Sequence, residues 1–120
     1  MARYVDGFVF PVPKKNVAAY RRLASGAGRI WRKHGALEYF ECLGDDLKTK
    51  GTASFLKQCK AKPSETIIFS WIVYKSRAHR DQVNTKVMND PRLMKLCDPK
   101  KPLFNVKQML VGGFKVLVEF

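Results

Sequence analysis

Asp6, Glu41 and His79 are the side chains of this sequence best placed to move a proton. Asp6 and Glu41 occur within aromatic-rich segments, and His79 follows another such segment. A carboxylate or imidazole flanked by indole and phenol rings is desolvated, which brings its pKa toward neutrality and suits it to acid or base catalysis. We therefore predict Asp6, Glu41 and His79 as catalytic residues of a pocket between a sheet and its helices.

The same pocket would need aromatic and imidazole side chains to hold an organic ligand. The predicted ligand-binding residues are Trp31, His34, Tyr39 and Trp71. A second interpretation competes with this one: the aromatic side chains form the core, and the acidic ones pair with nearby arginines. The sequence favours that second interpretation over catalysis, so it leaves open whether the protein is an enzyme.

No metal ion or cofactor is predicted. His34 and His79 are the only histidines, and no H-x-H or H-E-x-x-H spacing accompanies them. The three cysteines form no C-x-x-C pair, which argues against a disulfide framework and a thiolate zinc site and is typical of a reducing cytoplasm. Gly26 and Gly28 fall inside a predicted helix, and Trp31 stands where a dinucleotide fingerprint needs its third glycine.

The charge balance makes nucleic acid an alternative partner. The chain has 23 Lys and Arg against 10 Asp and Glu, a formal net charge of +13, which attracts polyanions. The predicted phosphate-contacting residues are Arg21, Arg22, Arg29, Arg32 and Lys33. Because no block of five or six basic residues occurs, a charged and soluble surface is the favoured explanation. Nucleic acid binding is therefore allowed but not favoured.

The elements that must position these residues follow from the hydrophobic pattern. Strands are predicted at 4–12, 37–43, 66–74 and 109–120, and a helix of about five turns starts at Val17. Ser76 is the expected N-cap of a second helix, which Asp90 and Pro91 end before a short further turn. We expect one domain over 1–120, with halves 4–43 and 66–120 joined by a polar linker, 44–65.

This β-α-β-β-α-β order predicts an α+β fold. Right-handed crossovers in both halves, combined into one sheet, give the ferredoxin-like arrangement with a four-stranded antiparallel sheet. Both faces of that sheet are apolar: Phe69 and Trp71 alternate with Ile68 and Ile72, and Phe8 with Val9. Since the helices cover one face, we predict a homodimer that packs through the other.

Four segments resemble the YbaA-type bacterial family of unknown function. They are YVDGFVFPVPKKN (4–16), IWRKHGALEYFEC (30–42), FSWIVYKSRAHRDQVNTKVMNDPRL (69–93) and GGFKVLVEF (112–120). The resemblance covers nearly the whole chain. It implies a dimeric α/β barrel, the arrangement also used by antibiotic-biosynthesis monooxygenases and by haem-degrading and chlorite-dismutase-like proteins. It implies no established activity.

The prediction for function is therefore a cytoplasmic homodimer that binds or transforms a small organic molecule between its sheet and helices. If it is an enzyme, an oxygenase-like or isomerase-like reaction is expected. The alternatives are a ligand-binding dimer without catalysis and a basic RNA-associating protein. No apolar run approaches the roughly 20 residues that span a bilayer, so no membrane partner is expected.

Overall fold

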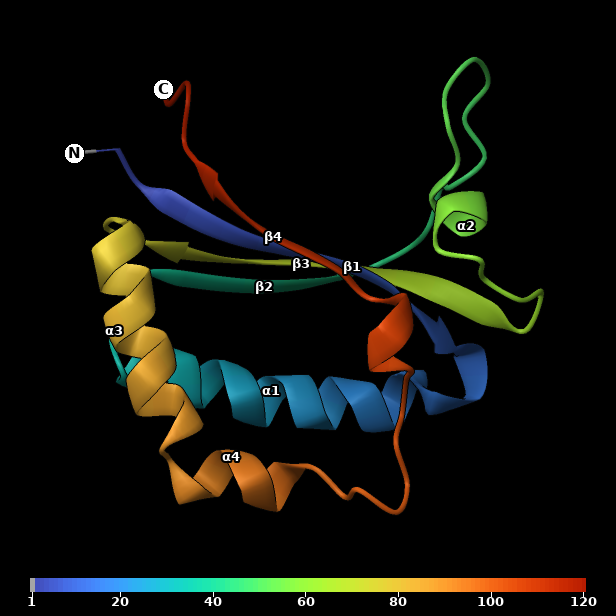
Figure 1. Cartoon of the computed structure of the whole chain (residues 1–120). Helices are drawn as coiled ribbons and strands as arrows, with labels where there is room; N and C mark the ends of the chain where they lie inside the picture. The colour runs from blue at the N-terminus through green and yellow to red at the C-terminus, as the bar shows by residue number, and fades with distance from the viewer. Residues whose placement is uncertain (1) are drawn as a thin grey trace.

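The computed structural model describes residues 2–120, which form one antiparallel sheet with helices beneath it (Figure 1). The strands are β1 (Tyr4–Pro13), β2 (Glu38–Leu43), β3 (Glu65–Tyr74) and β4 (Leu110–Lys115). The helices are α1 (Val17–Lys33), α2 (Phe55–Gln58), α3 (Arg77–Met88) and α4 (Pro91–Leu96), with short 3-10 turns at Lys14–Asn16 and Val106–Gln108.

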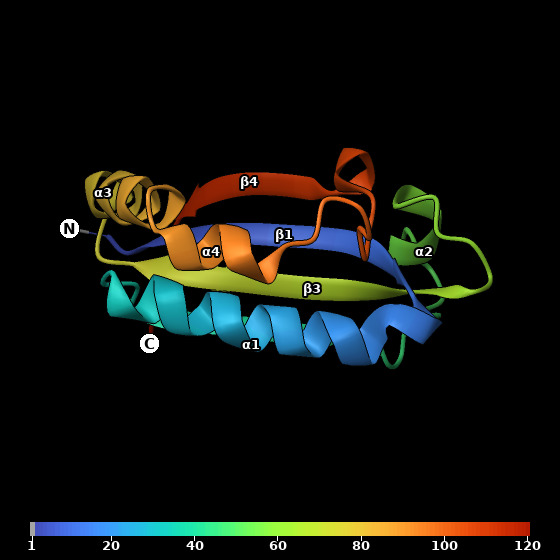
Figure 2. The same ribbon diagram turned by 90° about the horizontal axis from the view of Figure 1, so that it is seen from below.

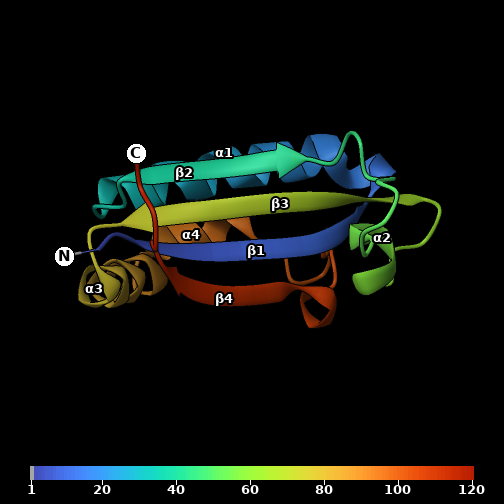
Figure 3. The same ribbon diagram turned by 90° about the horizontal axis from the view of Figure 1, so that it is seen from above.

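The sheet has the order β2-β3-β1-β4, which Figure 3 shows from above. β1 and β3 form the centre, and their register runs from Tyr4 opposite Tyr74 to Pro13 opposite Glu65. β2 pairs with β3, and β4 pairs with β1, both antiparallel. Two β-α-β units interleaved in this order are the ferredoxin-like arrangement. The predicted α+β fold with a four-stranded antiparallel sheet is confirmed.

Helix α1 packs against the sheet along the apolar stripe that the sequence shows. Tyr20, Ala24 and Ile30 are buried on that side. Gly28 is buried as well, and the helix packs so closely there that a Cβ would lie 2.9 Å from the Tyr39 ring. Gly35 ends the helix with a φ of +115°, a conformation that favours glycine. The helix therefore lies close enough to β2 to contact Tyr39 directly.

The two C-terminal helices begin as the sequence predicts. The Ser76 hydroxyl accepts a hydrogen bond from the His79 amide at the start of α3, and the Asp90 carboxylate accepts one from the Arg92 amide at the start of α4. Val83 and Val87 of α3 are buried. Seen from below, α1 and α4 run along the sheet while α3 lies at one end of it (Figure 2).

The last strand is shorter than predicted. β4 ends at Lys115, and residues 116–120 turn away from the sheet on the face opposite the helices (Figure 1). Lys115 lies opposite Tyr4, the first residue of β1, and one more backbone hydrogen bond, from the Val116 amide to the Arg3 carbonyl at 3.0 Å, follows where β1 begins. Leu117 is consequently 95% exposed.

The predicted linker contains a structured turn. Residues Phe55–Gln58 form α2, and Ser54 caps it by accepting hydrogen bonds from the Leu56 and Lys57 amides. The Phe55 ring packs edge-on against Phe69 of β3, with 6.2 Å between the ring centroids. Part of the linker thus lies against the sheet face that the other helices leave bare.

Candidate functional site

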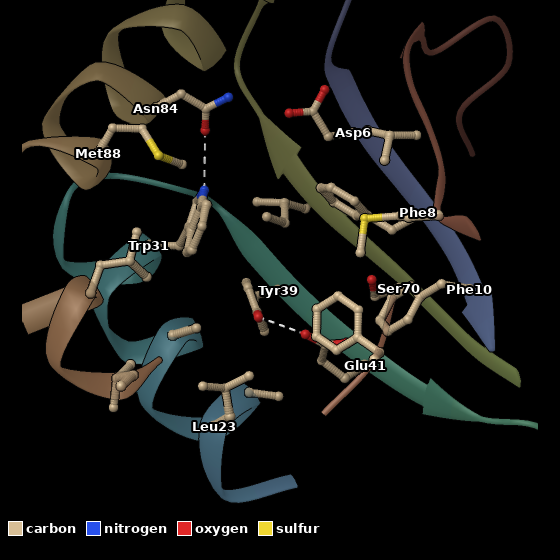
Figure 4. A pocket seen from close by; sticks show the side chains of 18 of the residues that line it. Asp6, Phe8, Phe10, Leu23, Trp31, Tyr39, Glu41, Ser70, Asn84 and Met88 are labelled. Atoms are coloured by element: carbon tan, nitrogen blue, oxygen red, sulfur yellow. Dashed lines mark hydrogen bonds between the residues drawn. The ribbon is translucent and has the colours of Figure 1, made fainter. Parts of the chain in front are cut away.

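A cavity of about 460 Å³ lies on the helix side of the sheet. Side chains of β1, β2 and β3 line it from the sheet, and those of α1, α3 and α4 line it from the opposite side. Figure 4 shows polar groups at two separate places in it, with apolar side chains between them. The described lining is mostly apolar and includes Phe8, Phe10, Leu23, Ile72 and Met88.

At one polar end Asp6 is 5% exposed and binds Arg80 of α3. The Arg80 Nη1 donates to Asp6 Oδ1 at 2.6 Å. Burial raises the pKa of the Asp6 carboxyl, and the Arg80 guanidinium opposes that shift. Beside this pair, the Asn84 side-chain oxygen accepts hydrogen bonds from Trp31 Nε1 and from the Tyr74 hydroxyl, each at 3.2 Å. Every polar group at this end is therefore held by a neighbour.

At the other polar end Glu41 accepts two phenolic hydrogen bonds. The Tyr20 hydroxyl of α1 donates to Oε1 at 2.8 Å, and the Tyr39 hydroxyl donates to Oε2 at 2.6 Å. Burial, reinforced by the Glu41 carboxylate, raises the pKa of both phenols well above their usual range. Both phenols therefore stay protonated and remain donors at neutral pH. Ser70 of β3 lies opposite Glu41 in the sheet and also lines the cavity.

The structure brings some of the predicted site residues together. Asp6, Trp31, Tyr39 and Glu41 all line the cavity. Strand parity explains this, because Asp6 of β1 and both β2 residues point to the helix side. No group of three or more His, Cys, Asp or Glu side chains within residues 2–120 is arranged to hold a metal ion. The chemical roles of these four residues stay predictions.

Three other predicted residues lie outside the cavity. His79 Nδ1 accepts a hydrogen bond from the Lys75 amide at 2.9 Å, which holds the ring at the start of α3. His34 Nε2 lies 2.8 Å from Asp90 Oδ2, at the junction of α1 and α4. Trp71 alternates with Ser70 and therefore points to the opposite face of the sheet. The prediction that these three share one pocket with Asp6 and Glu41 is wrong.

Sequence reasoning missed several cavity residues. Tyr20 lies on the apolar side of α1, a position that by itself predicts a core side chain and no polar role. Ser70 lies on the strand face shared by Ile68, Ile72 and Tyr74, so strand parity is the signal that places it on the helix side. Arg80 and Asn84 lie on α3 with no sequence pattern that distinguishes them, because only the packing of α3 against β1 brings them to Asp6.

A second hollow of about 680 Å³ lies between α1 and β2. Arg21, Arg29 and Arg32 line it, three of the five residues predicted to contact phosphate. Arg22 and Lys33, the other two, are exposed on α1 and are not part of its lining. We call this hollow the arginine groove. The arginine groove and the cavity lie on two sides of one wall. The residues that line both spaces are Tyr20, Ala24, Tyr39 and Glu41.

The sheet face opposite the helices exposes aromatic side chains. Trp71 stacks on Phe40, with ring centroids 4.9 Å apart, and meets Phe69 edge-on at 5.6 Å. Phe40 is 44% exposed and Phe69 is 43% exposed, while Phe114 of β4 is 61% exposed. Figure 3 looks onto this face and shows α2 at one end of it and the C-terminal residues crossing over the other end. We call it the open face.

Within residues 2–120, no helix combines the length and the apolar character that a membrane span requires.

Comparisons with known proteins agree with this fold. Residues 3–105 match the model of a family described as a protein of unknown function, DUF1428. The uncharacterized protein YbaA of Escherichia coli K12 is 39% identical over 117 residues, which cover 98% of each chain, and YbaA of Shigella flexneri matches equally.

Solved structures show the same fold at low identity. A nipsnap family protein with unknown function from Agrobacterium tumefaciens superposes with a TM-score of 0.60 at 16% identity, covering 96% of this chain and 88% of the other. A dimeric ferredoxin-like protein from an uncultured marine organism gives a TM-score of 0.58 at 11% identity, with both chains fully covered.

Proposed function

The chain belongs to the DUF1428 family, whose function is unknown, and we propose from its own cavity that it binds a small, largely apolar organic molecule as a homodimer. The observation that carries the proposal is the cavity of about 460 Å³ with buried polar groups at two places. A mostly apolar concave site with few convergent polar groups is typical of small-molecule binding. The 39% identity to YbaA confirms the family resemblance predicted from the sequence.

The polar groups select the chemistry of the ligand. Asp6 and Glu41 contribute carboxylate oxygens, which can each accept more than one hydrogen bond, and Ser70 contributes a hydroxyl beside Glu41. These groups favour a ligand that donates hydrogen bonds, such as an aromatic alcohol or amine, and they disfavour a carboxylate or phosphate. The aromatic walls, among them Phe8 and Trp31, suit a flat ring.

Binding is better supported than catalysis. Both oxygens of Glu41 already accept hydrogen bonds, from Tyr20 and Tyr39. A proton from a ligand would therefore have to compete with two phenolic hydrogen bonds already made to this carboxylate. Asp6 is held by Arg80, and His79 lies outside the cavity. An isomerase-like reaction with Glu41 as base is the second candidate, because Glu41 is the predicted acid-base residue that faces the cavity without a cationic partner among the described residues.

The two tryptophans allow a direct test by NMR. Trp31 lines the cavity and Trp71 lies on the opposite face, so their indole N–H signals report on the two sides of the sheet separately. We expect 2-naphthol, an aromatic alcohol, to shift the Trp31 signal saturably and to leave the Trp71 signal in place. Ala27→Phe, which fills the cavity from α1, abolishes the shift, whereas Ala18→Phe on the exposed side of α1 retains it.

Two outcomes would contradict the proposal. One is the absence of a saturable Trp31 shift up to millimolar 2-naphthol in the wild-type chain. The other is a shift of equal size in the Ala27→Phe variant, which would place the binding elsewhere.

The open face supports the homodimeric part of the proposal. Phe40, Phe69 and Phe114 leave apolar area in water that a second sheet could cover. Face-to-face packing of two such sheets around a two-fold axis is self-complementary. The marine protein of the same fold is described as dimeric, which supports a dimer for this chain. Sedimentation velocity at micromolar concentration tests it: we expect twice the 13.7 kDa chain mass, and a stable monomer would refute it.

A further inference from the structure

The arginine groove carries positive charge that the fold does not use. Arg21 and Arg29 are exposed, and neither forms an ion pair with a carboxylate within residues 2–120. Arg32 donates to the Leu37 carbonyl, so it closes the end of the groove near the C-terminus of α1. Arg21 and Arg29 are eight residues apart on one helix, which places them about 12 Å apart along its axis.

The other wall of the groove adds ring surface and one satisfied carboxylate. Tyr20 and Tyr39 present phenol rings, and Leu43 of β2 adds an apolar side chain. Glu41 is the one carboxylate among the described lining residues, and both its oxygens are turned to the two phenols. The charge of the lining side chains therefore remains positive, and the guanidinium groups keep donors available.

We propose that the arginine groove binds the anionic group, a carboxylate or a phosphate, of a small aromatic molecule. Guanidinium groups bind both anions through paired N–H donors, and their planar faces also stack on rings. The phenol rings and Leu43 would contact the ring of the ligand. This site does not depend on the cavity: the cavity presents acceptors and selects a donor, whereas the groove presents donors and selects an anion.

A small molecule fits the groove better than a polyanion does. The arginines line a hollow of about 680 Å³ whose opposite wall is phenolic and apolar, which suits a single anionic ligand. A nucleic acid backbone would instead track the whole basic side of α1, where Arg22 and Lys33 lie outside the groove. The groove is on the helix side of the sheet, so pairing through the open face leaves it accessible.

Phenyl phosphate is a suitable probe, since it combines a ring with a doubly charged anion. Its affinity is measured by isothermal titration calorimetry at 150 mM salt, where exposed charges are largely screened beyond about 8 Å. The test variant is Arg21→Gln with Arg29→Gln. The matched control is Arg22→Gln with Lys33→Gln, which also removes two positive charges from α1 but leaves the groove intact. All four side chains are exposed, and circular dichroism verifies that both variants fold.

We expect the groove variant to bind phenyl phosphate at least about tenfold more weakly than wild type, as the loss of charge-assisted hydrogen bonds implies. The control variant should stay within about twofold of wild type if screened charges contribute little. Equal weakening of both variants, or no binding by wild type at millimolar probe, would overturn the proposal. A 12-nucleotide oligouridine that binds more tightly than the probe, and weakens equally in both variants, would do so as well and would indicate a polyanion surface.

Discussion

Phe114→Glu should dissociate the dimer proposed for this chain. Phe114 lies on the open face and is 61% exposed. A phenylalanine of about 200 Å² would then bury about 120 Å² on pairing, worth about 3 kcal/mol at 25 cal/mol per Å². A two-fold axis doubles this to about 6 kcal/mol, so the dissociation constant should rise by about four orders of magnitude. The buried carboxylate would add to the effect.

Sedimentation velocity across nanomolar to micromolar concentration measures this change. Met94→Glu is the control, because Met94 is 77% exposed but lies on α4, on the helix side. That variant should keep the wild-type dissociation constant. The reasoning is refuted if Phe114→Glu remains a dimer with unchanged affinity, or if Met94→Glu dissociates to the same extent. Circular dichroism should show an intact fold for both, since neither side chain is buried within one chain.

Three further substitutions test the contacts around the site by urea denaturation. Gly28→Ala should destabilise the fold by about 1–3 kcal/mol, because its Cβ would lie 2.9 Å from the Tyr39 ring; a gain of about 1 kcal/mol from helix propensity would contradict this. Asp6→Ala should cost about 1–3 kcal/mol, because Arg80 loses its buried partner and keeps only the exposed Asp81; an unchanged midpoint would contradict this. Hydrogen bonds hold the pKa of Asp90 well below its usual value, so its stabilisation is present above about pH 4 and is lost as the pH falls further. Asp90→Asn should therefore flatten the loss of stability as the pH falls from about 4 to about 2, and an equally steep loss would argue against the contribution of Asp90.

The candidate site was predictable where strand parity alone decides direction. Asp6, Tyr39 and Glu41 fall at positions whose side chains point to the helices, and the structure places all three in the cavity. The same parity puts Trp71 on the opposite face, where it stacks on Phe40, because the chemistry of an indole does not decide which side of a strand it occupies. His79 lies outside the cavity for another reason: its ring turns back to the Lys75 amide, a local contact that no periodicity indicates.

The sequence by itself determined the order of the elements and the presence of two apolar sheet faces. Hydrophobic period, caps and breakers act over a few residues, so they predicted α1, the Ser76 cap and the start of α4 correctly. Only the tertiary structure decided which side chains meet across the layers: Arg80 with Asp6, and Tyr20 with Glu41. It also decided that β4 ends at Lys115, opposite the first residue of β1, with a single further backbone hydrogen bond from Val116 to Arg3. These contacts join residues distant in sequence, whose approach depends on how the helices pack against the sheet.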